Sequence, residues 1–237
     1  TGGAGPDVIS GGAGGTTGTG LDGGAGNDII TGGTGNDTID GGTGNDTITA
    51  SAGNNTVVGD TGNDIITTGA GNDIITTGTG IDTVDAGAGT DSITSGVGAD
   101  VIDGGAGTDT YVTDSAQVGT GTLTTGIEGA GTGTSTGLVV NLGSTAITNS
   151  VVLSKTGEYL AQGLTSVASG AVAYLFNDSL VTHSTSVDTI SNIENVTLSG
   201  NGINYVVGSS GANVIVGGTG VDTITTGADD DTIYGST

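Results

Sequence analysis

The sequence has almost no basic residues. Its 237 residues include one Lys or Arg against 25 Asp and Glu, which gives a formal net charge of −24. Proteins that bind nucleic acid need clustered Lys and Arg to neutralise phosphates, and attraction to anionic lipid headgroups needs them as well. The composition therefore excludes a nucleic-acid partner. Since no apolar run approaches the length of a membrane span, direct membrane insertion is not expected either.

Cys, Met and Trp are absent, and there is one His, at His183. Without Cys there is no thiol nucleophile, and one His cannot supply the two histidines of an HExxH zinc site. Its many carboxylates lie in repeated, similar surroundings, which gives no reason for their pKa values to diverge as acid–base catalysis requires. The chain is therefore predicted not to be an enzyme.

The sequence is rich in Gly, with 52 residues, and many of them recur at a period of nine. From Gly23 to Val112 ten nonapeptides follow one another without a gap, beginning GGAGNDIIT, GGTGNDTID and GGTGNDTIT. Position four is always Gly, position eight is always apolar, and position six is Asp in nine repeats and Asn55 in the other. A fixed period this strict predicts a solenoid.

Each nonapeptide is expected to form a six-residue loop followed by a three-residue strand. Glycines allow the tight loop, and the alternation along the strand directs the position-eight side chain into the core. Two repeats then close one coil, and successive coils stack at about 4.8 Å as two parallel sheets. One aliphatic residue in nine is a small core, so apolar burial alone does not offset the cost of ordering the chain.

The position-six carboxylates are the candidates for this missing stabilisation, because two repeats per coil place them in two columns. The first column contains Asp7, Asp28, Asp46, Asp64, Asp82 and Asp100, and the second contains Asp37, Asn55, Asp73, Asp91 and Asp109. Stacked carboxylates repel unless a cation lies between them, and calcium accepts about six to eight oxygen ligands in flexible geometry. Turn chemistry alone does not require Asp at the same phase in nine repeats. The columns predict calcium sites, weaker on both sides of Asn55.

The pattern GGxGxD followed by x-apolar-x resembles the nonapeptide of the RTX family, the calcium-binding parallel β-roll of type I-secreted bacterial proteins. The resemblance implies an all-β parallel β-roll, or β-solenoid, in which aspartates and loop carbonyls hold multiple Ca2+ ions between the loops of successive coils. It also implies that folding is coupled to calcium binding. The low hydrophobicity and high net charge otherwise favour disorder, so the predicted order is conditional on the cation.

Three regions are expected along the chain. Residues 1–112 are predicted to form an RTX β-roll, which includes a longer repeat from Gly11 to Asp22 with Leu21 in the apolar position. Residues 113–198 lose the nine-residue phase, and short β-branched clusters there predict an irregular β insertion or join. Residues 199–237 return to the phase as a second RTX block. Its position-six residues are Asn204, Asn213, Asp222 and Asp231, of which the two aspartates are metal-ligand candidates.

Three kinds of function fit these features. The first is a calcium-dependent structural protein of a bacterial cell-surface layer or extracellular filament. Type I-secreted S-layer proteins are similar in having RTX repeats, abundant Thr, Gly and Ala, almost no Lys and no Cys. The second is the C-terminal secretion module of an exported enzyme or toxin. The third is an RTX adhesin or another binding module, including an ice-binding face.

A structural protein of a cell-surface layer or filament is expected to have particular partners and a particular location. Other copies of the chain are the expected partners, through lattice or filament contacts, and cell-surface polysaccharide is a further candidate. The expected location is secreted, extracellular and at the bacterial cell surface, with which the absence of Cys is consistent. The sequence starts and stops within repeats, so it is expected to be a piece of a longer protein.

Overall fold

The structure is a computed structural model that describes residues 1–12, 20–96, 98–113, 135–141, 147–148, 159–160, 166–167, 171–176, 187–198, 204–218 and 222–235. The chain divides into two compact units. Unit 1 contains Thr1–Tyr111 and Ser191–Ile193, and unit 2 contains Val112–Ile190 and Glu194–Thr237. None of the described residues is helical, and so this part of the chain holds no helix that could cross a membrane. The predicted all-β class with stacked parallel strands is confirmed.

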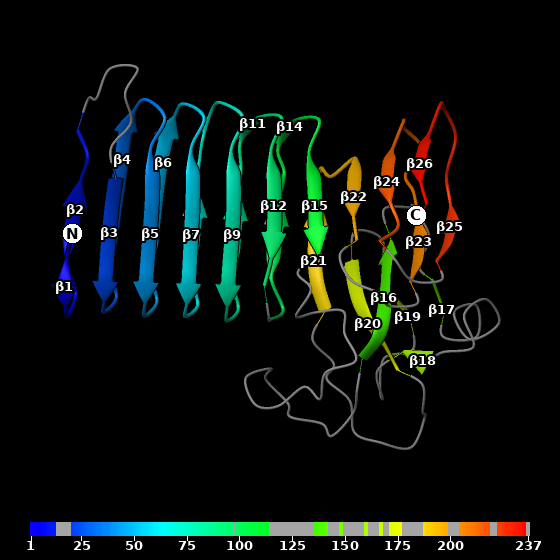
Figure 1. Cartoon of the computed structure of the whole chain (residues 1–237), viewed down its shortest axis with the longest axis horizontal. Coiled ribbons are helices and arrows are strands. Elements are labelled where there is room, and N and C mark those ends of the chain that lie inside the picture. The colour runs from blue at the N-terminus through cyan, green and yellow to red at the C-terminus, as the bar shows by residue number, and fades with distance from the viewer. Residues whose placement is uncertain are drawn as a thin grey trace. The chain divides into compact units, whose positions relative to one another are not determined.

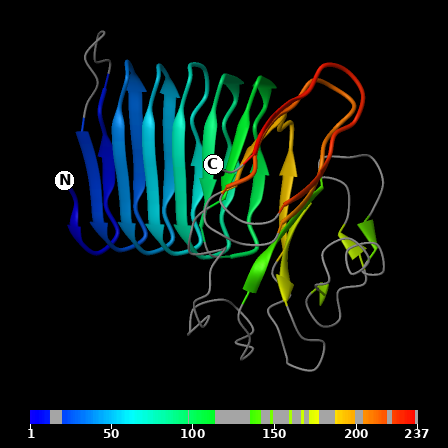
Figure 2. The same ribbon diagram turned by 45° about the vertical axis from the view of Figure 1, so that its right-hand side comes forward.

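Unit 1 is a roll of two parallel sheets that face each other (Figures 1 and 2). The first sheet runs in the order β1 (Gly3–Ala4), β3 (Gly20–Ala25), β5 (Thr38–Thr43), β7 (Thr56–Thr61), β9 (Ile74–Thr79), β12 (Ser92–Ser95) and β15 (Thr110–Thr113). The second runs in the order β2 (Val8–Ser10), β4 (Ile29–Thr34), β6 (Thr47–Ala52), β8 (Ile65–Thr67), β10 (Thr83–Asp85) and β13 (Val101–Asp103). A short parallel pair, β11 (Ala88–Gly89) and β14 (Ala106–Gly107), accompanies them.

The register confirms that two nonapeptides form one coil. In the second sheet Ile30 pairs with Ile48, and Ile48 pairs with Ile66. The same spacing relates Ile39 and Val57 in the first sheet. Leu21 pairs with Ile39, so it takes the apolar position despite the longer repeat that precedes it.

The core of unit 1 is the stripe of position-eight side chains. Ile30, Ile39, Ile48, Val57, Ile75, Ile93, Ile102 and Tyr111 are fully buried, and Ile66, Val84 and Leu21 are nearly so. Position-four glycine makes the stacking of the loops possible. At Gly44 the φ angle is +128°, and a Cβ there would collide with the carbonyl of Gly26 in the preceding coil. A side chain at this position would therefore be excluded twice, by conformation and by space.

Several strands are longer than the three residues that the sequence predicts. Strands β3 to β7 and β9 each contain six residues, because parallel pairing continues through positions two and three, as between Gly24 and Gly42. The alternation of side chains continues with it. Position-one residues such as Gly23 and Gly41 therefore face the interior of the roll, next to the position-six carboxylates.

Unit 2 combines parallel and antiparallel strands. One group has the order β22 (Asn195–Thr197), β24 (Val214–Val216) and β26 (Thr232–Tyr234), and the other has the order β21 (Val187–Ser191), β20 (Ala171–Phe176), β16 (Ser135–Asn141), β23 (Tyr205–Val207) and β25 (Thr223–Thr225). Strand β18 (Tyr159–Leu160) pairs with β20, and β17 (Ile147–Thr148) pairs with β19 (Ser166–Val167).

The pairing within unit 2 separates the repeats from the irregular region. The strands from the returning repeats pair in parallel, with Ile215 opposite Ile233 and Val206 opposite Ile224. Strands β16, β20 and β21 pair antiparallel, which the uniform nonapeptides of unit 1 never do. Val196, Val206 and Ile215 are fully buried in this unit. The sequence predicts strands here, whereas the antiparallel order carries no periodic signal. Lys155 and His183 lie outside the described residues.

Candidate metal centre

The position-six residues of unit 1 form two hydrogen-bonded ladders. In the first, the main-chain N–H of each residue donates to Oδ1 of the next, as from Asp28 to Asp46 and from Asp46 to Asp64, both at 2.8 Å. The ladder also joins Asp7 to Asp28, Asp64 to Asp82 and Asp82 to Asp100. The second ladder joins Asp37, Asn55, Asp73, Asp91 and Asp109 in the same way. The structure thus brings together the columns that the nine-residue phase predicts.

The two oxygens of these carboxylates have different surroundings. Oδ1 accepts the ladder hydrogen bond, whereas Oδ2 of Asp28, Asp46, Asp64 and Asp91 is buried and has no hydrogen-bond partner. The four residues are at most 1% exposed. Burial of an acceptor without a donor is costly, and more so when the acceptor is charged. Each of these oxygens needs either a proton or a cation.

Where position one is Gly, no side chain lies between the position-six Oδ2 and the next coil, and the gap there is tight. A Cβ at Gly41 would lie 2.8 Å from Asp46 Oδ2 and 2.8 Å from the carbonyl oxygen of Gly59 in the next coil. A Cβ at Gly32 would likewise lie 2.6 Å from Asp37 Oδ2 and 2.8 Å from the Ala50 carbonyl oxygen. We call this space, between a position-six Oδ2 and the position-one carbonyl of the next coil, the cradle.

The cradle fits a hard divalent cation by the chemistry of its oxygens. Carboxylate and main-chain carbonyl oxygens are the ligands that calcium uses in proteins, and their number can vary. The residues that face the cradles of the first column, such as Asp28, Asp46 and Asp64, could hold the ion. Its charge would complement the Oδ2 atoms that nothing else in the fold satisfies.

Burial raises the pKa of several position-six carboxyl groups. It raises the pKa of Asp64 to about 7, and ladder hydrogen bonding from Asp46 only partly opposes this. The pKa values of Asp82 and Asp91 are raised to about 6 for the same main reason. Desolvation also raises the pKa of Asp46, with a smaller contribution from the Asp28 charge. Without a cation, Asp64, Asp82 and Asp91 therefore keep their protons to a higher pH than an exposed Asp does.

A second pair of ladders, from position-five Asn, supports the same loops without any carboxylate. The N–H of Asn45 donates to Asn27 Oδ1, and the N–H of Asn63 donates to Asn45 Oδ1, both at 2.9 Å. Matching bonds join Asn36, Asn54 and Asn72 on the other side. These bonds run toward the preceding coil, whereas the position-six bonds run toward the next one. Stacking of the loops therefore has a part that does not depend on charge.

The returning repeats of unit 2 pair Asn with Asp. Asn204 Nδ2 donates to Asp222 Oδ1 at 2.7 Å, and the N–H of Asn213 donates to Asp231 Oδ1 at 3.0 Å. These are the pairs that the sequence predicts for this block. Burial raises the pKa of Asp222, and the hydrogen bonds from Asn204 oppose the rise. Asp231 is only partly buried, so this block holds fewer buried carboxylates than unit 1.

No group of three or more His, Cys, Asp or Glu side chains gathers anywhere in the described ranges. Each cradle instead combines one carboxylate with main-chain oxygens, so the site is recognisable as a ladder rather than as a cluster. The residues that the sequence analysis overlooked are those at position one. Their change from Gly to Ala, Thr or Ser along the chain is visible in the sequence, but its meaning depends on their facing the interior.

A parallel β-roll with buried carboxylates stacked in its loops defines the class of cation-stabilised solenoids. The family model of the RTX calcium-binding nonapeptide repeat matches residues 1–15, 21–48, 49–84, 76–111 and 198–237. These matches cover more than half of the chain, and the chain belongs to this family. No curated protein matches it in sequence.

Proposed function

We propose that the chain is a calcium-dependent structural protein of a bacterial cell-surface layer or extracellular filament, which folds and assembles through its RTX repeats. The observation that carries the proposal is the set of buried Oδ2 atoms that face carbonyl oxygens across the glycine cradles. Several calcium ions would be held in the loops. The proposed ligands are Asp7, Asp28, Asp37, Asp46, Asp64, Asp73, Asp82, Asp91, Asp100, Asp109, Asp222 and Asp231.

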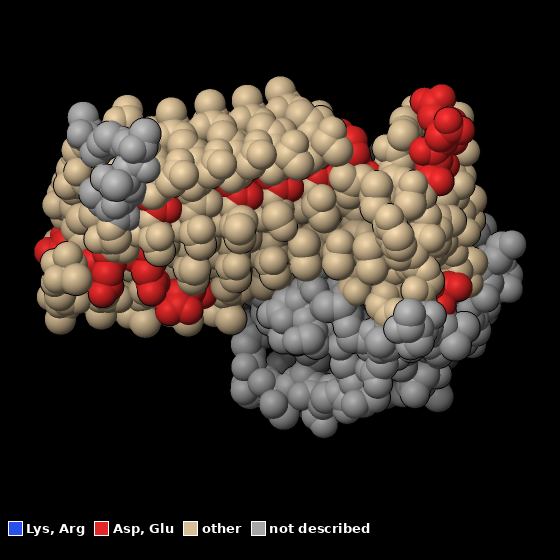
Figure 3. All heavy atoms as spheres, turned by 45° about the horizontal axis from the view of Figure 1, so that its top comes forward, with Lys and Arg blue, Asp and Glu red and all other residues tan. Residues whose placement is uncertain are grey.

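Calcium binding would couple folding to assembly through charge. The formal net charge of −24 opposes both compaction of the chain and the approach of a second copy. On the face shown in Figure 3 acidic side chains form rows along unit 1, and none of the described residues is Lys or Arg. Each bound calcium ion cancels two negative charges. The same ions that complete the loops would therefore lower the repulsion between copies.

An outward row of aliphatic and Thr side chains supports self-association. Strands of the second sheet place Val8, Ile29, Thr47, Ile65, Thr83 and Val101 side by side on the outer face. Val8 is 81% exposed, and Ile29, Ile65 and Val101 are about half exposed. A row of exposed aliphatic side chains on one sheet face suits a second copy of the same chain.

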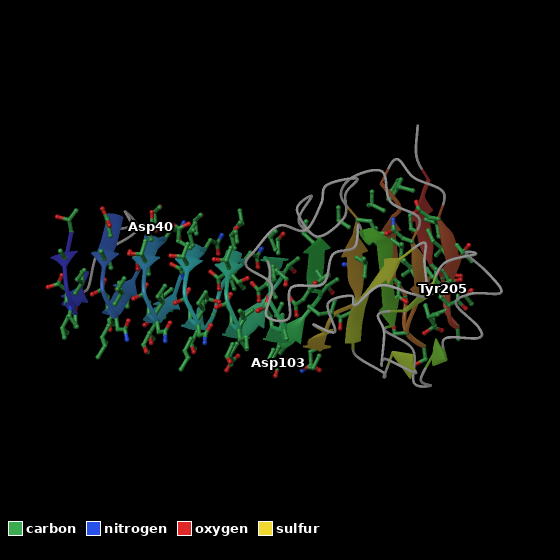
Figure 4. The ribbon with its side chains drawn as sticks, turned by 90° about the horizontal axis from the view of Figure 1, so that it is seen from below. Asp40, Asp103 and Tyr205 are labelled. Atoms are coloured by element: carbon green, nitrogen blue, oxygen red, sulfur yellow. The ribbon has the colours of Figure 1, made fainter. Side chains whose placement is uncertain are left out.

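The acidic residues on the outer faces distinguish this surface from a uniform Thr array. Asp40 and Asp103 lie on opposite sides of unit 1 and point outward, whereas Tyr205 of unit 2 is buried (Figure 4). Asp85 and Asp103 follow Thr67 in the row at position nine of the second sheet. An ice-binding face would need this row to be Thr throughout, so we favour assembly.

Membership of the RTX family supports a secreted, extracellular location, and the chain's other copies and cell-surface polysaccharide would be its partners. The alternative function is that of a calcium-folded module, either the secretion module of an exported enzyme or toxin or part of an adhesin. Such a module needs the same cradles but no association between copies.

The test is a calcium titration of chelator-treated protein, followed at once by circular dichroism and by light scattering. The proposal expects the β-signal and the scattering to rise together at millimolar calcium, and magnesium at equal concentration to give neither. A rise in β-signal with flat scattering favours the monomeric module. If calcium changes neither signal, the proposed role of the ion is wrong.

A further inference from the structure

The residue at position one changes along unit 1. It is Gly in the first coils, at Gly2, Gly23, Gly32, Gly41 and Gly59. From Ala50 onward it is mostly a residue with a side chain, at Ala50, Thr68, Thr77, Ala86 and Ser95, and the last repeat returns to glycine at Gly104. These five side chains are fully buried. Because position one borders the cradle, these repeats place a side chain at the cradle, whereas the glycine-lined repeats place none there.

The hydroxyl groups among them contact the two walls of the cradle. Ser95 Oγ donates to Asp100 Oδ2 at 2.7 Å, which is the oxygen that lacks a partner in Asp28 and Asp46. Thr68 Oγ1 donates to the carbonyl oxygen of Ala86 at 2.8 Å, which is the position-one carbonyl of the next coil. One hydroxyl thus binds the position-six carboxylate that borders its cradle, and another binds the position-one carbonyl of the next coil.

Thr77 is the position-one residue of the repeat that contains Asp82. Its Oγ1 accepts the main-chain N–H of Gly96 at 2.9 Å. The three hydroxyl-bearing residues stand in consecutive or alternate repeats, beside Asp73, Asp82 and Asp100. Of the three carboxylates, only Asp100 accepts a position-one hydroxyl on Oδ2, whereas beside Asp73 and Asp82 the Thr side chain occupies the cradle and Oδ2 stays without a hydrogen bond.

We infer that the hydroxyls of Thr68, Thr77 and Ser95 take the place of a calcium ion in their cradles, so that calcium is held mainly in the glycine-lined coils from Gly23 to Asp64. This inference rests on the proposed calcium binding and states where along the roll it occurs. A side chain that lies between Oδ2 and the next carbonyl leaves no room for an ion at the same point. At Asp100 the hydrogen bond from Ser95 also removes the unsatisfied acceptor that makes the cation necessary.

Amide groups satisfy the position-six ladder in the same way at other coils. At Asn55 an amide stands where other repeats have the carboxylate, and its Nδ2 donates to the carbonyl of Gly53 at 3.0 Å. Asn204 Nδ2 donates directly to Asp222 Oδ1. The chain thus uses internal donors at several coils and leaves the acceptor open at others. Unit 1 should bind fewer calcium ions than it has position-six aspartates, and its later coils should stay ordered at lower calcium.

The experiment measures bound calcium per chain by equilibrium dialysis at fixed free calcium, in wild type and in matched variants. Ser95→Gly opens a cradle and should add about one ion per chain, whereas Ser95→Ala removes the hydroxyl, keeps the Cβ and should add none. Gly41→Ser closes a cradle and should remove about one ion. A Cβ at Gly41 would lie 2.8 Å from Asp46 Oδ2 and from the Gly59 carbonyl oxygen, so the loop must shift to admit it. Circular dichroism at saturating calcium therefore checks that this variant folds, and Ser95→Gly, which removes a side chain, tests the inference without that requirement.

The outcomes separate this inference from the proposed function. If wild type binds no calcium, the proposed function is wrong. If wild type binds calcium and Ser95→Gly binds less, the hydroxyl is itself a ligand and the inference is overturned. Hydrogen exchange of wild type at limiting calcium gives a second test that needs no variant. Amides of β9 and β12 should stay protected after those of β4 and β6 have lost protection, and uniform loss would contradict the inference.

Discussion

The position-six carboxylate has two oxygens with separate roles. Oδ1 accepts a main-chain N–H from the preceding coil, and an amide oxygen can do this equally well, as Asn55 does for Asp37 at 2.9 Å. Oδ2 faces the cradle, where an amide nitrogen would point instead. The difference between Asp and Asn at this position is therefore a difference in the need for a cation, with the ladder retained in both.

We predict that Asp64→Asn makes its coil less dependent on calcium. The new amide keeps the acceptor for Asp46 and can donate to the carbonyl of Gly62, as Asn55 does to Gly53. At limiting calcium the variant should be more stable than wild type by about 1 kcal/mol, the net value of one hydrogen bond. It should also bind less calcium. Denaturant unfolding at limiting and at saturating calcium measures the stability, and equilibrium dialysis measures the bound calcium.

Asp64→Ala is the matched control for that variant. It removes the Oδ1 acceptor together with Oδ2, so it should be less stable than wild type at limiting and at saturating calcium alike. Equal behaviour of the Asn and Ala variants would show that the amide does not replace the cation in this coil.

We predict that the metal-free protein gains order as the pH falls. Burial raises the folded-state pKa of Asp64 to about 7, from an ordinary value of 3.8, and that of Asp82 and Asp91 to about 6. The folded state therefore binds more protons than the unfolded state between these values. Its stability is fully present at low pH and is lost as the pH rises through 6 and 7. Circular dichroism in chelator should show more β-signal at pH 5 than at pH 7.5.

General charge repulsion would produce a similar trend, so a variant is needed to separate the two causes. Asp64→Asn removes the group with the highest pKa among these three and one charge of many. It should move the loss of β-signal to a clearly different pH. An unchanged midpoint would assign the effect to net charge and contradict the role of buried carboxyls.

At the scale of strands, stability comes from one inward side chain per repeat and from hydrogen bonds between coils. Ile48 is fully buried between Ile30 and Ile66, whereas Ile29 in the adjacent strand is 51% exposed. We predict that Ile48→Ala costs about 2–5 kcal/mol at saturating calcium. Ile29→Ala should cost much less, within about 0.5 kcal/mol of wild type. Denaturant unfolding of both compares the faces, and similar costs would contradict the assigned register.

The Asn ladder should add stability that is independent of calcium. We predict that Asn45→Ala costs about 0.5–1.5 kcal/mol, because it leaves the N–H of Asn63 without its acceptor. The cost should be the same for protein at saturating and at tenfold lower calcium. Asn45→Asp keeps an oxygen acceptor and is the control. A cost that grows as calcium is lowered would mean that this ladder also depends on the ion.

The strands show how far the sequence predicts the fold. Period nine gives the coil, the position-eight stripe and the columns of Asp, because each depends only on repetition and on side-chain alternation. The cradle could not be predicted from the sequence. It exists only because the alternation of side chains continues past the three-residue strand, so that Gly41 and Ser95 face Asp46 and Asp100. The antiparallel pairing of β16 and β20 could not be predicted either, since strands outside a repeat have no sequence pattern that identifies the strand they pair with.

For the whole molecule, the balance is between a small core and a large negative charge. The buried stripe contributes one side chain per nine residues, and the charge of −24 opposes compaction. A cation could act on this balance in two ways. It could screen the charge from solution, or it could bind in the cradles and satisfy buried oxygens. These modes differ in their dependence on the identity of the ion.

We predict that compaction requires calcium specifically. An unfolded chain of 237 residues has a radius of gyration of about 50 Å, and small-angle scattering in chelator should approach this value. Calcium should reduce it by more than a third. Magnesium carries the same charge, but it demands near-octahedral geometry and gives up water reluctantly, so it should not compact the chain at equal concentration. Sodium chloride at equal ionic strength screens without ligation and should also fail. Compaction by either salt would mean that screening, rather than the carboxylate and carbonyl oxygens of the cradles, controls the order of the roll.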